Sequence, residues 1–122
     1  RLNKANVSFV RADLFQGVRG RYNLITVNPP YIRSAEIAAL SRDVRDFEPH
    51  LALDGGVDGL DFYRRIAEKI NRYIVRGGMC ILECGEGQAQ EIIRIFRTVA
   101  RCDFAMVVRD LAGVERIVKI GF

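Results

Sequence analysis

The sequence predicts an α/β fold built on an open, mostly parallel sheet with an antiparallel hairpin at one edge. Short apolar runs alternate with longer segments whose apolar residues recur every three or four positions, which is the pattern of strands alternating with helices. Two further strand-like runs lie near the end of the sequence and are separated only by a short turn. The 122 residues, of which 49% are hydrophobic, are enough for one domain with an ordinary core.

The first elements of the chain are two predicted strands. A short alternating strand at 7–10 is followed by Asp-Leu-Phe at 13–15, and a loop with two glycines at 16–21 leads to a second strand at 22–27. This second strand is apolar nearly throughout, as strands covered on both faces are.

A short amphipathic helix is predicted after Ser34, which is a suitable N-cap residue. Its apolar residues at helical spacing are Ile37, Leu40, Val44 and Phe47. The next stretch, 48–60, contains three glycines and follows neither periodicity. We therefore expect a loop there that ends at an Asp58 cap.

A longer helix is expected from Leu60 to the glycine pair at 77–78. Its apolar stripe consists of Leu60, Tyr63, Ile66, Ala67, Ile70 and Ile74. The arginines on the rest of its surface indicate a solvated face more than a binding site.

The last part of the chain is predicted to hold three strands and one helix. A buried strand at 79–83 ends at Glu83 and precedes a glycine-containing turn at 85–87. The core face of the following helix is predicted to be Ala89, Ile92, Ile93, Phe96 and Ala100. Strands at about 103–109 and 115–121 then form the hairpin.

Charge and cysteine content restrict the class of protein only weakly. The net charge is +4 and the pI is about 9.3, but Lys and Arg are spread along the chain and favour no class of partner. The odd set Cys80, Cys84 and Cys102 lacks metal-ligand spacing, which indicates free thiols, a reducing cytoplasm and no metal site. Neither a signal sequence nor a long apolar span is visible, so nothing suggests secretion or insertion into a membrane.

The most informative motif is Asn28-Pro29-Pro30-Tyr31, directly after the second strand. Proline lacks an N–H and favours an extended residue before it, so carbonyl oxygens remain available as the chain leaves the sheet. The Asn28 side-chain oxygen and the Pro29 carbonyl oxygen together match the two hydrogens of one –NH2 group, and Tyr31 offers a flat face beside it. The motif predicts a site for a planar amino or amide nitrogen. The alternative is that two prolines merely end a strand and Tyr31 covers the core.

Several motifs, taken in order, resemble one enzyme family. They are Asp-Leu-Phe at 13–15, Asn-Pro-Pro-Tyr-Ile at 28–32, Glu-Pro at 48–49 with Ala-Leu-Asp-Gly-Gly-Val-Asp-Gly-Leu at 52–60, Leu-Glu-Cys-Gly at 82–85 with Gln88, and Asp110, Gly113, Glu115 and Arg116. Together they resemble the release-factor-specific protein-(glutamine) N-methyltransferases over nearly all 122 residues. Adenine methyltransferases share the Asn-Pro-Pro-Tyr motif but not the 48–60 stretch, which is the most discriminating part.

The resemblance implies part of a class I, Rossmann-like methyltransferase sheet and transfer of a methyl group from S-adenosylmethionine. The acceptor would be the side-chain nitrogen of the glutamine in the Gly-Gly-Gln motif of a peptide-chain release factor. Asn28 and Pro29 would hold the –NH2 group, and Pro30 and Tyr31 would shape the slot. No strong base is needed, because positioning and acceptor oxygens help most as charge develops on nitrogen. His50 is therefore left out of the catalytic set.

The resemblance also implies which residues border the cofactor. Asp13 would accept the adenine amino group, Leu14 would add backbone or apolar contact, Phe15 would pack nearby, and Asn28 would border the methyl-bearing end. A loop cap is the alternative for Asp13. Glu48 and Glu83 could orient the Asn28–Tyr31 motif or the cofactor, or serve only in a cap or turn.

The resemblance finally implies that 1–122 is the C-terminal portion of a catalytic domain. The glycine-rich turn after a first strand and the acidic residue for a ribose do not occur before the strand at 7–10, nor does an N-terminal helical domain. The strand at 7–10 would then lack its neighbours, and exposed strand edges invite association with a second copy. A release factor is the expected partner, with no nucleic-acid substrate and no membrane. The alternatives are a methyltransferase acting on the adenine amino group of a nucleic acid, and a non-catalytic fragment.

Overall fold

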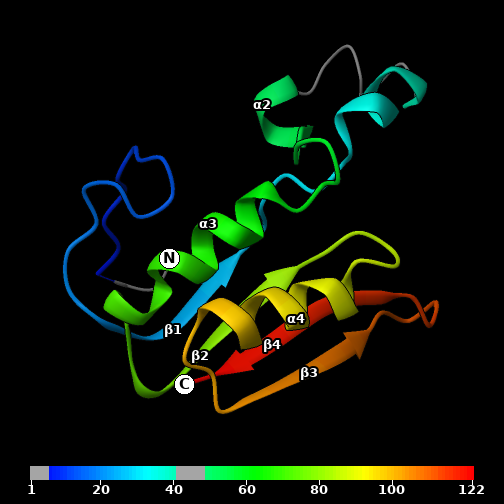
Figure 1. The fold of residues 1–122 in the computed structure, drawn as a ribbon. Coiled ribbons are helices and arrows are strands. Elements are labelled where there is room, and N and C mark those ends of the chain that lie inside the picture. Colours follow the sequence, from blue (N-terminus) through cyan, green and yellow to red (C-terminus); the bar gives the residue numbers. More distant parts are fainter. Residues whose placement is uncertain (1–5, 41–48) are drawn as a thin grey trace, which may run out of the picture.

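The computed structural model describes residues 6–40 and 49–122 (Figure 1). Its elements, in chain order, are β1 (Tyr22–Val27), η1 (Ser34–Ala39), α2 (His50–Leu53), α3 (Asp61–Lys69), η2 (Ile70–Arg72), β2 (Ile74–Glu83), α4 (Ala89–Val99), β3 (Phe104–Arg109) and β4 (Glu115–Gly121). Strands and helices alternate along the chain up to the final hairpin, so the predicted α/β class is confirmed.

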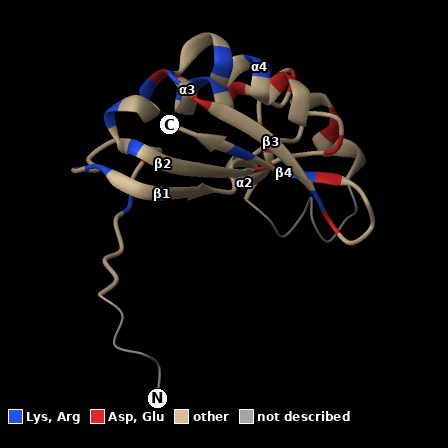
Figure 2. Cartoon of the chain, turned by 90° about the horizontal axis from the view of Figure 1, so that it is seen from below, with Lys and Arg blue, Asp and Glu red and all other residues tan. Residues whose placement is uncertain are grey.

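The four strands form one sheet in the order β1-β2-β4-β3. β1 and β2 are parallel, whereas β4 is antiparallel to both β2 and β3. The predicted hairpin is therefore confirmed, but among the described residues the sheet is mixed, with one parallel pair, rather than mostly parallel. Figure 2 shows α3 and α4 on the same face of this sheet.

The core lies between that face and the two helices. Cys80 and Leu82 of β2 and Val118 and Ile120 of β4 are fully buried there, two positions apart on each strand as the strand period requires. The predicted apolar faces of both helical segments are buried, and their members are Leu60, Tyr63, Ile66, Ala67, Ile70, Ile74, Ala89, Ile92, Ile93, Phe96 and Ala100. Helical periodicity thus located the core correctly.

The end of the long helix was predicted wrongly. α3 ends at Lys69, a 3-10 turn follows, and the glycine pair at 77–78 lies inside β2. Ile74 already pairs with Tyr22 of β1, and the Gly77 N–H donates to the carbonyl of Phe122. The Phe122 N–H also donates to the Gly78 carbonyl, so Phe122 holds both glycines in the strand, and glycine has a low helix propensity.

The strand predicted at 7–10 does not form. Residues 6–12 carry no assigned secondary structure, and the Phe9 side chain is 94% exposed. A strand needs a neighbour for its hydrogen bonds, and in the described part of the chain none pairs with this segment. β1 is an edge strand, so association of a second copy at this edge remains a prediction.

The segment after the Asn-Pro-Pro-Tyr motif also differs from expectation. A six-residue 3-10 helix, capped by Arg33, replaces the start of the expected amphipathic helix, and Ser34 is not its cap. Ser34 instead donates its hydroxyl to Asp54, 2.6 Å away. Val44, Phe47 and Glu48 lie outside the described residues.

The expected loop at 48–60 contains the four-residue helix α2. Asp58 bonds the N–H of Leu60, at 3.0 Å, which precedes the first residue of α3. The cap prediction is therefore wrong in detail: Asp58 closes the turn before the helix and forms an ion pair with Arg64. Arg64 also pairs with Asp61, so this arginine belongs to a local ion-pair group.

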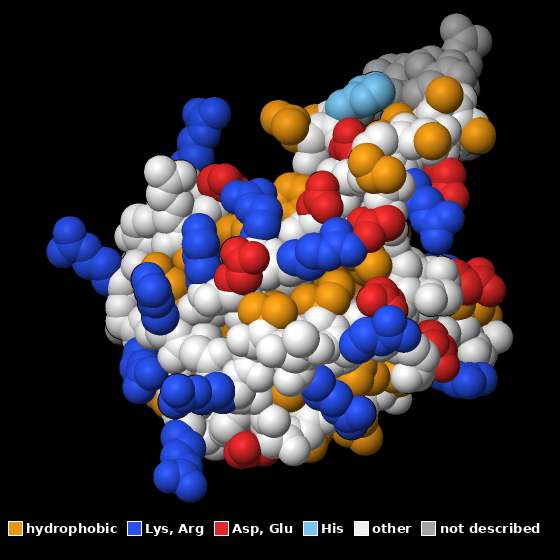
Figure 3. Space-filling view, in the orientation of Figure 1, with side chains coloured by type: hydrophobic (Ala, Val, Ile, Leu, Met, Phe, Trp, Pro, Cys, Tyr) orange, Lys and Arg blue, Asp and Glu red, His pale blue; other side chains and the backbone are white. Residues whose placement is uncertain are grey.

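The surface shows no single basic face in the view of Figure 3, where Lys and Arg side chains are mixed with Asp and Glu. This arrangement fits the interpretation of the helix arginines as a solvated surface. None of the helices within 6–40 and 49–122 has the length and apolar character needed to cross a membrane.

Candidate active site

The Asn28–Tyr31 motif, called the clamp below, lies where β1 ends. β1 and β2 are parallel and Val27 pairs with Leu82, so the clamp and Glu83 leave the sheet at the same edge. Asn28 is exposed, Pro29 is buried, and Pro30 and Tyr31 are half-buried. Open α/β sheets bind ligands at this carboxyl edge, so the clamp occupies a suitable position for a site.

Asn28 borders two cavities. One, of about 120 Å³, is lined by the clamp together with Ile32, Ala52 and Leu53. The other, of about 240 Å³, brings Asn28 together with Glu83 and with the apolar side chains of Val27, Ile81 and Ile117. The Asn28 carboxamide therefore lies between two recesses, as expected for a group that contacts two ligands.

The loop that carries Asp54 holds the end of the clamp. The N–H of Ile32 donates to Leu53 at 3.1 Å, and the N–H of Gly55 donates to Ile32 at 2.8 Å, which forms an isolated parallel bridge between Ile32 and Asp54. The Asp54 carboxylate accepts from the Ser34 hydroxyl and from the Gly56 N–H, and these bonds lower the pKa of Asp54. The glycine-rich stretch is thus a second layer behind the clamp.

Two glycines in this stretch allow the close approach. A Cβ on Gly55 would lie 2.8 Å from the Tyr31 Cα and 2.9 Å from the Pro30 carbonyl oxygen. Gly59 has a φ of +78°, and a Cβ there would meet the Tyr31 carbonyl oxygen. Side chains at these positions would push the clamp out of place, which explains the glycines at 55 and 59.

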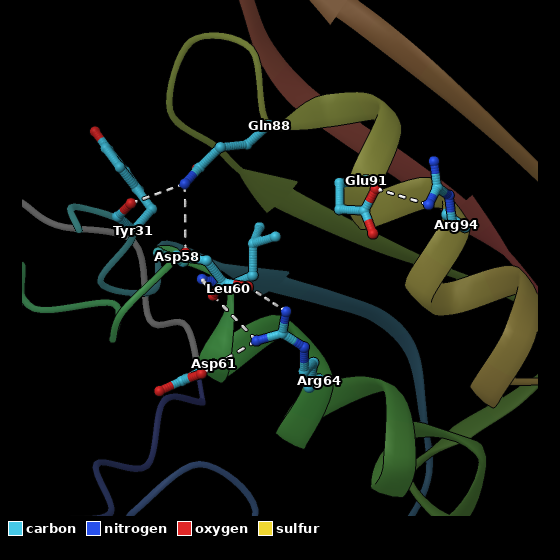
Figure 4. A network of polar contacts seen from close by, with 9 residues as sticks. Tyr31, Asp58, Leu60, Asp61, Arg64, Gln88, Glu91 and Arg94 are labelled. Carbon is cyan, nitrogen blue, oxygen red and sulfur yellow. Dashed lines mark hydrogen bonds and ion pairs between the residues drawn. The ribbon is translucent and has the colours of Figure 1, made fainter.

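Gln88 connects the clamp to two other loops, as Figure 4 shows for its contact with Tyr31. Its Nε2 donates to the Tyr31 carbonyl oxygen at 2.9 Å and to the Gly59 carbonyl oxygen at 3.4 Å. Its Oε1 accepts from the Gly85 N–H at 2.9 Å. One side chain therefore joins the clamp, the glycine-rich loop and the turn after β2.

Glu83 acts on the clamp through the Tyr31 ring. The Tyr31 hydroxyl donates to Glu83 Oε1 at 3.2 Å, and the Tyr63 hydroxyl donates to the Glu83 carbonyl at 2.7 Å. Burial, followed by the negative charge of Glu83, raises the pKa of Tyr31, so its hydroxyl remains a donor at neutral pH. The structure thus gives Glu83 a contact that orients the clamp, one of the roles that the sequence left open.

Asp13, Leu14 and Phe15, the residues expected at the cofactor, line cavities other than the two that Asn28 borders. Asp13 forms an ion pair of 2.6 Å with Arg65 and lines a cavity of about 730 Å³ with Phe62. Leu14 and Phe15 line a separate apolar cavity of about 350 Å³, which Thr26 and Val27 also border. Phe15 stacks on Tyr73 with ring centroids 4.4 Å apart. In the described part of the chain, the cavities lined by Asp13, Leu14 and Phe15 do not include Asn28. Thr26 and Val27 border both the Leu14 and Phe15 cavity and one of the Asn28 cavities.

Two negative expectations concern metals and thiols. Across 6–40 and 49–122, no group of three or more His, Cys, Asp or Glu side chains has the arrangement of a metal site. Cys80, Cys84 and Cys102 are free thiols, as predicted, and the first two are buried. His50 is exposed at the start of α2.

Sequence reasoning placed the clamp but not the residues that hold it. In the sequence, the glycines at 55 and 59 predict only a loop, and Gln88 is one residue of a motif that resembles the methyltransferase family. Some glycine-rich stretches form the turn between a strand and a helix. Glycines in another kind of loop, such as those at 55 and 59, are a usable signal for close packing against a neighbouring backbone. No local pattern identifies Gln88, since its contact with Tyr31 joins residues 57 positions apart.

Comparison with known proteins identifies the relatives of this chain. No protein-family model matches it. Proteins named release factor glutamine methyltransferase match at 38% identity over 94% of the chain in Thermodesulfovibrio yellowstonii, at 41% over 93% in Geobacter sulfurreducens, and at 43% over 92% in Bradyrhizobium diazoefficiens. The matches cover 41%, 40% and 38% of those proteins, so the chain spans about two fifths of their length.

A solved structure agrees with these matches. The crystal structure of a release-factor-specific protein-(glutamine-N5) methyltransferase from Alicyclobacillus acidocaldarius superposes with a TM-score of 0.53 and 30% identity, covering 82% of this chain and 48% of that one. The α/β fold described above is therefore a part of this methyltransferase fold. By sequence and by structure, the chain is a homologue of the release factor glutamine methyltransferases and corresponds to about two fifths of their length.

Proposed function

We propose that the protein containing this chain methylates the side-chain amide nitrogen of the glutamine in the Gly-Gly-Gln motif of a peptide-chain release factor. The observation that carries the proposal is the clamp. It places an exposed Asn28 carboxamide and the Pro29 carbonyl at the carboxyl edge of the sheet, on a loop held by Asp54, Gly59 and Gln88. The names of the relatives, release factor glutamine methyltransferases, support the same proposal independently.

The clamp suits an amide nitrogen because such a nitrogen is a weak nucleophile that mainly needs orientation. Asn28 Oδ1 and the Pro29 carbonyl oxygen accept the two hydrogens of the –NH2 group, which turns the nitrogen lone pair away from both acceptors. The same oxygens stabilise the positive charge that grows on nitrogen during methyl transfer. Tyr31, fixed through its hydroxyl by Glu83, presents its ring beside the planar amide.

The methyl donor of this proposal is S-adenosylmethionine, which supplies a methyl group on a positively charged sulfur. The residues present fit one end of it. Leu14 and Phe15 line an apolar cavity of about 350 Å³ suited to a purine ring, and Phe15 is fixed by its stack on Tyr73. Asp13 lines a separate cavity and holds Arg65 through Oδ2, so acceptance of the adenine amino group by Asp13 stays part of the proposal. Asn28 would border the methyl-bearing end.

The release factor is the proposed protein partner, and no observation favours a nucleic-acid substrate instead. On the face that Figure 3 shows, Asp and Glu side chains lie among the Lys and Arg side chains over the centre and right, whereas a phosphate backbone usually follows an uninterrupted basic surface. The clamp itself does not separate glutamine from adenine, since both present a planar –NH2 group. The assignment to glutamine therefore follows the relatives.

Asn28→Ala in the complete natural protein tests the proposal. Loss of one preorganised hydrogen-bond partner should raise the barrier by about 2–4 kcal/mol, or slow single-turnover methylation about 30- to 1000-fold. Binding of the release factor should change little, because its folded surface makes most of the contacts. Asn23→Ala, at an exposed position of β1, is the matched control.

Asn28→Asp sharpens the test. The carboxylate keeps acceptor oxygens but adds a negative charge beside the positively charged cofactor, so we expect tighter cofactor binding without restored turnover. A release factor whose motif glutamine is replaced should accept no methyl group. Methylation at a normal rate by Asn28→Ala would remove Asn28 from the catalytic set, and methylation of adenine in DNA or RNA by the wild type would replace the proposed substrate.

A further inference from the structure

We propose that Gln88 is a positioning residue for the clamp. Its side-chain amide fixes the Tyr31 carbonyl and thereby the direction in which Asn28 and Pro29 present their acceptor oxygens. This inference rests on the proposed function of the clamp, but the hold of Gln88 on Tyr31 is measurable without any methylation.

The need for such a residue follows from the two prolines. Pro29 and Pro30 have no N–H, so they cannot anchor the clamp by donating hydrogen bonds of their own. The next two N–H groups belong to Tyr31 and Ile32, and that of Ile32 donates to Leu53. The Tyr31 carbonyl accepts from Gln88 Nε2 at 2.9 Å. Gln88 therefore supplies from outside a donor that the prolines cannot supply within the clamp.

The Gln88 amide is itself held in one orientation. Its oxygen accepts from the Gly85 N–H at 2.9 Å, and its nitrogen donates to both the Tyr31 and Gly59 carbonyls. Turning the amide over would place its oxygen against two carbonyl oxygens and its NH2 group against an N–H. The backbone of Gln88 is fixed as well, because its carbonyl accepts from Ile92 in the first turn of α4.

The surrounding sequence leaves room for this contact. A Cβ on Gly59 would lie 2.5 Å from Gln88 Nε2, and a Cβ on Gly85 would lie 2.9 Å from Gln88 Oε1. Two of the three residues bonded to the amide are thus glycines, at positions where a Cβ atom would displace it. The two glycines are independent support for a fitted amide at this position.

A misplaced clamp should affect turnover more than substrate binding. Gln88 lies behind Tyr31 and touches neither proposed substrate nor cofactor, so its loss would tilt the acceptors without removing them. Displacements of about 1 Å at a reacting group cost on the order of 100-fold in rate. We therefore expect a lower kcat with a nearly unchanged KM for the release factor.

Gln88→Glu in the complete natural protein is the sharpest test. The variant keeps an acceptor for the Gly85 N–H but sets a carboxylate oxygen against the Tyr31 and Gly59 carbonyls. Protonation of that carboxyl restores one donor, so the defect relative to wild type should shrink as the pH falls. We expect a 10- to 100-fold lower kcat at pH 8 and a several-fold recovery of the ratio by pH 6.

The matched control is Gln90→Glu, which makes the same charge change at an exposed position of α4. Figure 4 shows the ionisable side chains of Tyr31, Asp58, Asp61, Arg64, Glu91 and Arg94 in the same region as Gln88. Glu83 accepts from the Tyr31 hydroxyl, and Glu86 lies in the turn before Gln88. They are common to wild type and variant, so the ratio of rates at each pH cancels their titration. A merely structural loss would lower the rate equally at every pH.

A direct readout follows Tyr31 without catalysis. In protein labelled with 3-fluorotyrosine, the Tyr31 fluorine signal is assigned by its absence in Tyr31→Phe. It should move in Gln88→Glu, return toward the wild-type position on acidification, and stay unmoved in Gln90→Glu. A Tyr31 signal and a rate profile that match those of Gln90→Glu would overturn the inference. A wild type that methylates no release factor would refute the proposed function, and the fluorine signal would still decide the role of Gln88.

Discussion

Gly59→Ala should damage the site more than backbone strain predicts, and Gly87→Ala is its matched control. Both glycines have a φ of +78°, where a side chain is strained. Their surroundings differ. A Cβ on Gly59 would meet the Tyr31 carbonyl oxygen and lie 2.5 Å from Gln88 Nε2, whereas a Cβ on Gly87 has no described atom within 4 Å. The comparison therefore isolates the contact with the clamp.

The expected magnitude follows from these two differences. The left-handed conformation costs an alanine roughly 1–2 kcal/mol, and the stiffer unfolded chain offsets part of this, so strain alone should lower the free energy of unfolding by about 1 kcal/mol. In Gly59→Ala the methyl group also separates Gln88 from the Tyr31 carbonyl. A polar group left without its partner costs about 1–3 kcal/mol. We expect Gly59→Ala to be less stable than Gly87→Ala by about 2 kcal/mol.

Denaturant unfolding and single-turnover methylation of the complete natural protein measure both effects. Gly87→Ala should methylate a release factor at close to the wild-type rate, because the 85–88 turn keeps its contacts. Gly59→Ala should be at least about 10-fold slower, because the clamp moves with the displaced carbonyl. Equal stability and equal rates in the two variants would refute the account of the glycine-rich loop as the layer behind the clamp.

Two further predictions concern ionisable groups. The pKa of Asp54 is lowered by its hydroxyl and amide hydrogen bonds, so its contribution to stability is present above the ordinary carboxyl range and is lost as the pH falls through the lowered pKa. Asp54→Asn should thus unfold at a lower temperature than wild type at pH 7 but lose less stability below about pH 4. Asp103→Asn, the control, should follow wild type. Parallel acid profiles for Asp54→Asn and wild type would contradict this prediction. Burial raises the pKa of Cys80 to about 12 and that of Cys84 to about 11. At pH 8 a thiol reagent should therefore modify the half-buried Cys102 first and reach the other two only on unfolding, and rapid reaction of all three in the native protein would be inconsistent with the buried core.

Local patterns predicted the core and the position of the clamp because both depend on short-range regularities. Apolar residues at helical spacing found the faces of α3 and α4, and an apolar strand followed by Asn-Pro-Pro-Tyr found the edge of the sheet. The same patterns failed where secondary structure depends on pairing with a distant segment. The strand at 7–10 has a strand-like sequence but no neighbour to pair with in the described structure. The glycine pair at 77–78 lies in a strand because both glycines exchange backbone hydrogen bonds with Phe122, between the residues Ile74 and Met79 that pair with β1.

The residues that hold the clamp were not predictable from spacing, because each reaches it across the chain. Gln88 contacts Tyr31 over 57 positions and Glu83 contacts it over 52. A glutamine before a helix and a glutamate at the end of a strand are common, and neither has a local signature of its role. Only the fold shows that both side chains converge on one tyrosine, at its carbonyl and at its hydroxyl.

This convergence bears on how such a site selects its substrate. In the proposed role, Asn28 and Pro29 would recognise only an –NH2 group, so they would not distinguish one planar amide or amine from another. Residues 54–59, which belong to the 48–60 stretch that the resemblance predicts to be discriminating, lie behind the clamp: Asp54 pairs with Ile32, and Gly55 and Gly59 approach Pro30 and Tyr31 closely. The sequence of this stretch therefore fixes the height and tilt of Tyr31 relative to the acceptor oxygens. Under the proposed function, we therefore expect substitutions in the layer that supports the clamp to change methylation as well as substitutions in the clamp itself.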